Sequence, residues 1–300
     1  MRVLIIADME GVSGIETYEA TVRTHPAYAG GVQLMAAEVN ALAEAAFEAG
    51  AGSVSVIDWH GGGGNLHPEL LHPRVAVVPE DLSRGYDVAI LSGFHAMAGA
   101  ENAFLSHTMT SGLALTLEGR PAGELALLSR WAGEHEIPIG LVTGDRATSL
   151  EAETWLDQTP TLTVKQAVAW DRATALPVEQ AHRALREMVA RVLGRPDRWW
   201  VYRPTRPVEA LVRLQRATEL AARIPGVSLE DGSLRVRLPS VKALIDLIDV
   251  FTALIRSEEQ RELLEAIAAD PAAGLVLERE RARRRGQLRR GSVSSDPSAW

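Results

Sequence analysis

The stretch VLIIADMEGVSG, Val3–Gly14, decides the fold of this chain. A short apolar run, typical of a buried strand, ends there in two acids, Asp8 and Glu10, and a glycine-rich loop. An open α/β sheet carries its chemistry in the loops at the carboxyl ends of its strands. The stretch therefore predicts a strand of an α/β sheet with both acids at the functional edge.

The same pattern recurs at the next two predicted strands. The apolar run Val54–Ile57 leads into Asp58 and His60, and the run Val88–Ser92 leads into His95. Three successive strands thus bring side chains of the metal-ligating type to one edge of the sheet.

Strands and helices alternate along most of the chain, which predicts the α/β class, with a mostly parallel sheet covered by helices on both faces. We expect strands at 3–7, 53–57, 88–92, 138–143 and 161–168, a hairpin-like segment at 115–120, and helices at 31–49, from 123, 148–156 and 178–192.

The segment 194–207 breaks this rhythm with prolines and large aromatic residues, so we expect a domain boundary there. Residues 1–195 are then a metal-binding catalytic α/β domain. Residues 207–270 are a smaller C-terminal α+β unit of β-α-β-α order, with elements at 208–214, 217–224, 233–238 and 241–256. The arginine-rich residues 278–300 are expected to form a mobile tail.

Composition narrows the possible function classes. The chain has 300 residues, 46% of them hydrophobic, and a net charge of −8. That charge argues against a nucleic-acid partner, which needs clustered positive charge. No apolar run approaches the length of a membrane span, and no leader segment precedes the first strand, so we expect a cytoplasmic protein without a membrane partner.

The absence of cysteine means that any bound metal must be held by His, Asp or Glu. Two-metal hydrolytic sites need about five or six such ligands, with one carboxylate often shared by both ions. Five candidates converge on the predicted edge, namely Asp8, Glu10, His60, His95 and Glu124. A single such residue at a strand end is more often a cap or turn former, and it is the convergence that favours a metal site.

Two further residues have candidate roles near this set. Asp58 is expected to accept the outer ring proton of a ligand histidine, although a plain turn carboxylate explains it equally well. His107 follows His95 within one long loop and is the candidate general acid or base, with a loop hydrogen bond as the alternative.

Seven motifs, taken in order, resemble one known family over residues 1–256: Asp8–Gly14, Asp58–His60, Gly93–Ala96, Ser106–Met109, Gly123–Leu125, Gly144–Asp145 and Val164–Gln166. The chain resembles the zinc-dependent D-aminopeptidases of bacterial dipeptide-transport operons. An acid-x-acid-Gly-x-Ser-Gly start followed by these motifs is highly specific.

The resemblance implies a two-zinc aminopeptidase that acts on short peptides with D-configured N-terminal residues such as D-alanine. By motif, Asp8 bridges the two ions, Glu10 and His95 complete one site, and His60 and Glu124 complete the other, with His107 as the catalytic histidine. The resemblance also implies a homo-oligomer, with a decamer of stacked five-membered rings as its specific form, that admits only small peptides.

Two other functions remain open from the residues alone. The same ligand set could serve a dimetal hydrolase of another amide or of a phosphoester. It could also belong to a non-catalytic protein that binds a metal or a peptide. The same acidic ligand set could also take manganese or cobalt, because affinity order and metal availability decide which ion is bound.

Overall fold

A computed structural model describes residues 1–270 and 273–280 of the chain. The chain forms two compact units, one spanning Met1–Thr252 and a second beginning at Ala253. The first unit contains a seven-stranded sheet and a five-stranded sheet. None of the described helices is both long and apolar enough to cross a membrane.

The larger sheet is a parallel α/β sheet with one antiparallel edge, and its strand order is β3-β2-β1-β4-β7-β8-β9. Its strands are β1 Arg2–Ala7, β2 Ser53–Asp58, β3 Val75–Val77, β4 Val88–Phe94, β7 Ile139–Asp145, β8 Thr161–Ala169 and β9 Arg172–Ala175. The neighbours of β1 are β2 and β4, both parallel to it. The three strands that lead into the candidate ligands therefore lie side by side.

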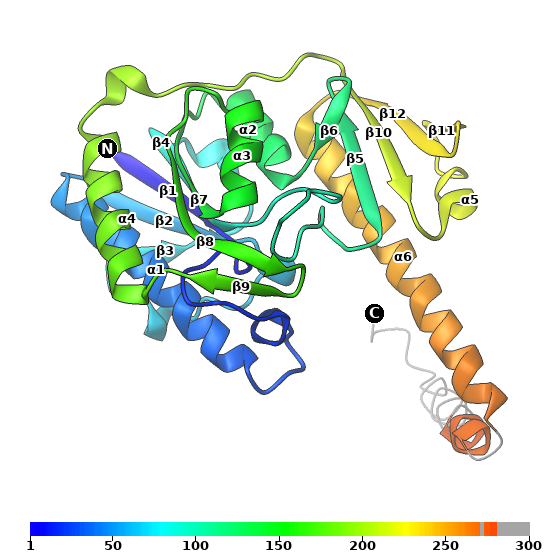
Figure 1. The fold of residues 1–300 in the computed structure, drawn as a ribbon. Helices are drawn as coiled ribbons and strands as arrows, with labels where there is room; N and C mark the ends of the chain where they lie inside the picture. The colour runs from blue at the N-terminus through cyan, green and yellow to red at the C-terminus, as the bar shows by residue number, and fades with distance from the viewer. Residues whose placement is uncertain (271–272, 281–300) are drawn as a thin grey trace, which may run out of the picture. The chain divides into compact units, whose positions relative to one another are not determined.

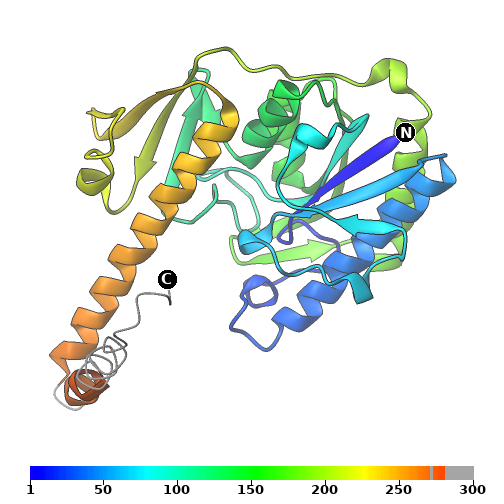
Figure 2. The same cartoon turned by 180° about the vertical axis from the view of Figure 1, so that it is seen from behind.

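Helices cover both faces of this sheet, which confirms the expected fold class. Both ribbon views place α1 beside α4 on one face and α2 beside α3 on the other (Figure 1 and Figure 2). Their bounds are α1 Tyr28–Glu48, α2 Glu124–Glu134, α3 Arg146–Trp155 and α4 Val178–Leu193. Alternate residues of β1, beginning with Val3 and Ile5, are fully buried in one core cluster with α1 and α4. Short 3-10 turns complete the connections, at η1 Tyr18–Thr21, η2 His60–Gly62, η3 Pro68–Leu70, η4 Leu82–Arg84 and η5 Pro196–Arg198.

The smaller sheet is antiparallel, with strand order β11-β12-β10-β5-β6. It is formed by β5 Leu113–Leu117, β6 Arg120–Ala122, β10 Val208–Leu214, β11 Val227–Glu230 and β12 Ser233–Leu238, followed by α6 Val241–Ala269 and preceded at β11 by the short α5 Thr218–Ala221. Both views place the first turns of α6 beside β5 and β10 (Figure 1 and Figure 2).

Three strands were not expected from the sequence, namely β3, β9 and β11. The smaller unit is therefore not a plain β-α-β-α repeat, because a β11–β12 hairpin follows α5. The small sheet also takes β5 and β6 from before the expected boundary at 195–207, so that boundary stays a prediction. Of the expected tail at 278–300, residues from 281 onward lie outside the described residues.

Candidate metal centre

The loop after β1 carries Asp8 and Glu10, which are buried with 3% and 6% exposure. The Asp8 amide donates to the carbonyl of Ser92 on β4 at 2.8 Å, and the Gly11 amide donates to Gly93 at 2.7 Å. A Cβ at Gly11 would lie 1.9 Å from the carbonyl oxygen of Phe94, so this approach requires glycine. The glycines of the loop thus let the two acids sit directly against the end of β4.

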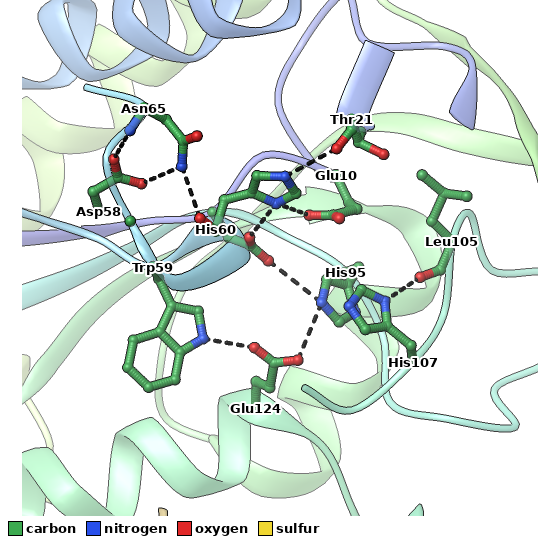
Figure 3. A network of polar contacts seen from close by, with 12 residues as sticks. Glu10, Thr21, Asp58, Trp59, His60, Asn65, His95, Leu105, His107 and Glu124 are labelled. Atoms are coloured by element: carbon green, nitrogen blue, oxygen red, sulfur yellow. Dashed lines mark hydrogen bonds and ion pairs between the residues drawn. The ribbon is translucent and has the colours of Figure 1, made fainter. Parts of the chain in front are cut away.

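His60 follows β2, and its ring points at Glu10 (Figure 3). Its Nδ1 lies 3.1 Å from Glu10 Oε2 and 3.4 Å from Asp8 Oδ1. Its Nε2 lies 3.1 Å from the backbone carbonyl oxygen of Thr21. The ring is therefore held between a backbone carbonyl on one side and the acids on the other.

His95 follows β4 and meets the other oxygen of Asp8. Its Nε2 lies 3.4 Å from Asp8 Oδ2 and 3.3 Å from Glu124 Oε1, at the first residue of α2. Glu124 also accepts from the Trp59 indole at 2.6 Å and from the Met109 amide at 2.6 Å. The structure thereby joins the ends of β1 and β4 to the start of α2.

His107 stacks on His95, with ring centroids 3.8 Å apart and planes 12° apart. Its Nδ1 lies 2.7 Å from the carbonyl oxygen of Leu105, to which it can donate (Figure 3). That bond fixes the proton of the neutral ring on Nδ1 and leaves Nε2 as an acceptor.

The five candidate ligands and His107 come together, in two groups. One group contains Asp8, Glu10 and His60, and the other contains His95, His107 and Glu124. Within each group, one potential ligand atom per residue lies within 4.8 Å of the others. Asp8 touches both groups, since its two oxygens face His60 and His95. In this grouping Glu10 lies with His60, and Glu124 lies with His95; the expected pairing of Glu10 with His95 and of His60 with Glu124 around each ion stays a prediction.

Burial and mutual charge strongly perturb the pKa values of this cluster. Burial, and then the Glu10 carboxylate, raises the pKa of Asp8 to about 7. Burial opposes ionisation of Glu10 and Glu124, but His60 holds the pKa of Glu10 well below its usual value, and His95 lowers that of Glu124 to about 2.

The histidines show the complementary effect. Burial disfavours their charged forms, but Glu10 raises the pKa of His60 to about 12, and Glu124 raises that of His95 well above its usual value. Burial and the nearby His95 instead lower the pKa of His107. The acids therefore hold protons on the imidazoles of His60 and His95, and these positive charges compensate the buried carboxylates. A bound divalent cation would compensate the carboxylates in the same way and would release those protons.

The donor set fits metal ions. Asp8 Oδ2 is buried without a hydrogen-bond partner in the structure. A buried carboxylate oxygen that accepts no hydrogen bond is costly, and a cation beside it would remove that cost. Three carboxylates and the imidazoles of His60 and His95 are ligand types that zinc accepts without thiolates.

The surroundings of His60 differ from expectation at Asp58. Its carboxylate does not reach the ring of His60, whose outer nitrogen meets Thr21 instead. Asp58 accepts from the Asn65 amide at 2.6 Å and from the Asn65 side chain at 2.8 Å, and Asn65 Nδ2 donates to the His60 carbonyl at 2.7 Å. Asp58 therefore shapes the glycine-rich turn 61–64 after His60 and acts on His60 only through Asn65.

Sequence reasoning assigned no role to three buried charged residues around the site. Glu38 of α1 accepts from the Ser13 amide at 2.8 Å, and its oxygens also lie within bonding distance of Ser92 and Thr143. Lys165 of β8 donates to the carbonyl oxygens of Glu10, at 2.8 Å, and of Ile15.

The third, Glu151 of α3, accepts from the Met97 amide at 2.6 Å. A signal for Glu38 existed in the sequence. It lies three residues after Met35 and four before Leu42, on the apolar face of a predicted helix, where an acid needs buried partners.

Buried carboxylates and imidazoles at the carboxyl edge of a parallel sheet define the class of α/β metal-dependent hydrolases. Comparison with known proteins makes this specific. Residues 1–250 match the D-aminopeptidase family, Peptidase M55, and the chain belongs to that family. The expected family and the expected metallo-aminopeptidase class are thereby confirmed.

Two relatives illustrate the similarity. A D-aminopeptidase of Bacillus subtilis (strain 168) is 28% identical over 271 residues, which are 85% of this chain and 96% of the relative. A solved structure, described as the Zn-dependent D-aminopeptidase DppA from Bacillus subtilis, a self-compartmentalizing protease, has a TM-score of 0.80 and 26% identity. That similarity covers 85% of this chain and 98% of the solved one.

Proposed function

We propose that this protein is a dinuclear zinc aminopeptidase that hydrolyses short peptides with D-configured N-terminal residues, such as D-alanine. The observation that carries the proposal is the position of Asp8 between the two ligand groups, with 3.4 Å from Oδ1 to His60 and 3.4 Å from Oδ2 to His95. A carboxylate that faces two sites with different oxygens is suited to bridging two metal ions.

We assign Asp8, Glu10 and His60 to one ion, and Asp8, His95 and Glu124 to the other. When bound, the zinc pair supplies an activated water and polarises the peptide carbonyl. Hydrogen bonds from neighbouring residues orient the side chains that would hold the ions. The Trp59 indole donates to one oxygen of Glu124, and the Met109 amide donates to the other. The backbone carbonyl of Thr21 fixes the ring of His60.

His107 is the proposed general base and acid. Because its Nδ1 faces the Leu105 carbonyl, the neutral ring presents Nε2 as a proton acceptor. Burial and His95 lower its pKa, which keeps that nitrogen free of a proton at neutral pH. Nε2 can then accept a proton during attack and return it to the leaving amine, as microscopic reversibility requires.

A panel of substrates tests the proposal. We expect hydrolysis of D-Ala-D-Ala and of D-alanine amide, with little or none of L-Ala-L-Ala, a γ-linked amide or nitrophenyl phosphate. Hydrolysis of only the L-peptide would contradict the stereochemistry, and hydrolysis of only the phosphate would contradict the peptidase assignment. Tight peptide binding without product would instead support a non-catalytic binding protein.

We also propose that the protein assembles as a homo-oligomer, with a decamer of stacked five-membered rings as the specific expectation. The related solved structure is described as self-compartmentalizing, which supports an assembly that encloses its active sites. Light scattering during size-exclusion chromatography should give a mass of about ten chains, and a monomer mass at micromolar concentration would contradict it.

A further inference from the structure

The antiparallel hairpin β8–β9 reaches beyond the parallel sheet to the loop that carries His107. At its tip, the carbonyl of Trp170 accepts from the Leu105 amide at 2.7 Å. The Trp170 indole nitrogen lies 3.3 Å from the carbonyl oxygen of Ser106, to which it donates. The two residues that precede His107 are therefore both bonded to one tryptophan.

This loop needs such support because its backbone is strained. Asn102, Leu105 and Met109 have positive φ values of 51°, 50° and 60°, although none is glycine. The Leu105 carbonyl is also the partner of His107 Nδ1, at 2.7 Å. A shift of Leu105 would therefore rotate the His107 ring or break the bond that fixes its proton.

The hairpin is itself fixed near its tip. The amide of Tyr18 donates to the Asp171 carbonyl at 3.2 Å, and the amide of Ala173 donates to the Glu16 carbonyl at 2.9 Å. Trp170 is 49% exposed and contacts the Tyr18 ring at 5.9 Å between centroids. Trp170 is therefore not a core residue. Its indole N–H donates to the loop that carries His107.

We propose that Trp170 is a positioning residue for His107, which it holds through Leu105 and Ser106. This inference rests on the proposed function, in which His107 transfers the proton. It requires that removal of the indole N–H reduces turnover through His107 and leaves the metal content unchanged.

Trp170→Phe keeps an aromatic ring beside Tyr18 and removes the indole N–H donor together with the second ring. We expect kcat on D-Ala-D-Ala to fall by about two- to tenfold, as loss of one hydrogen bond implies, with KM and zinc content unchanged. Trp200→Phe is the matched control, because Trp200 is similarly exposed, at 54%, and bridges Ile139 through the backbone. The control should keep wild-type kcat.

A double-mutant cycle separates positioning from general destabilisation. In a His107→Ala background, Trp170→Phe should not lower the residual turnover further, because its effect passes through His107. An equal loss in both backgrounds would overturn the proposal. So would an unchanged kcat in both Trp170→Phe and Trp170→Ala.

Hydrogen exchange of the metal-free protein gives a readout independent of activity. Residues 102–109 should exchange faster in Trp170→Phe than in wild type or Trp200→Phe, with the rest of the chain unchanged. Identical exchange in this segment would overturn the proposal. If the wild type hydrolyses no peptide, the proposed function fails, and the exchange comparison alone decides whether Trp170 holds the loop.

Discussion

Glu151→Gln should alter how the stability of the metal-free protein depends on pH. Glu151 is 7% exposed, its Oε2 accepts from the Met97 amide, and its Oε1 has no hydrogen-bond partner. Burial raises the pKa of its carboxyl to about 7 from 4.5. Between these values the folded chain holds a proton that the unfolded chain has lost, so the free energy of unfolding falls as pH rises from about 4.5 through 7.

The size of the effect follows from the two pKa values. Between pH 5 and pH 8, ionisation of Glu151 costs the folded state about 2 to 3 kcal/mol. The amide that Glu151→Gln introduces does not ionise, so the variant should gain that amount on the wild type over the same interval. Urea denaturation of both proteins, with chelator and at one protein concentration, measures the difference.

The change in the free energy of unfolding between pH 5 and pH 8 is the quantity compared. Any effect of the substitution on packing is the same at both pH values and cancels. Glu153→Gln is the matched control, because Glu153 lies on the same helix with a side chain that is 60% exposed. The free energy of unfolding of Glu153→Gln should depend on pH as that of the wild type does. Parallel wild-type and Glu151→Gln stability curves from pH 5 to pH 8 would refute the reasoning.

Three further substitutions address the site directly. His107→Ala should lower kcat by about 100-fold or more with both metals retained, and undiminished turnover would remove His107 from the mechanism. Asp8→Ala should lose both metals, as measured by plasma mass spectrometry, and retention of two would refute its bridging role. Lys165→Met removes the ammonium that donates to the Glu10 and Ile15 carbonyls. Zinc affinity, measured by competition with a chelator, should therefore fall about tenfold or more. An unchanged affinity would show that Lys165 does not support the loop that carries Asp8 and Glu10.

The main strands and the residues at the site were predictable because each signal is local. Val3–Ala7 is an uninterrupted apolar run, and such runs suit strands buried on both faces. By contrast, β3 spans only Val75–Val77, and an apolar run of three residues is too short to be told from a loop. The edge strand β9 has only four residues and is partly exposed.

The side-chain contacts within the site were not predictable, because they depend on where the loop after β1 turns each acid. Whether Glu10 faces β2 or β4 follows from the contacts of Gly11 with Phe94 and of Lys165 with Glu10, which are 83 and 155 positions apart in the sequence. The link from Asp58 to His60 through Asn65 likewise depends on the path of the glycine turn. The cytoplasmic location stays a prediction.

The most direct test of the central claim is the metal stoichiometry of untagged protein purified without chelator, measured by plasma mass spectrometry. Asp8 lies between the two ligand groups, so we predict about two zinc ions per chain. A chain that holds no zinc, even after zinc is offered in excess, would contradict the dinuclear site and the hydrolytic function built on it.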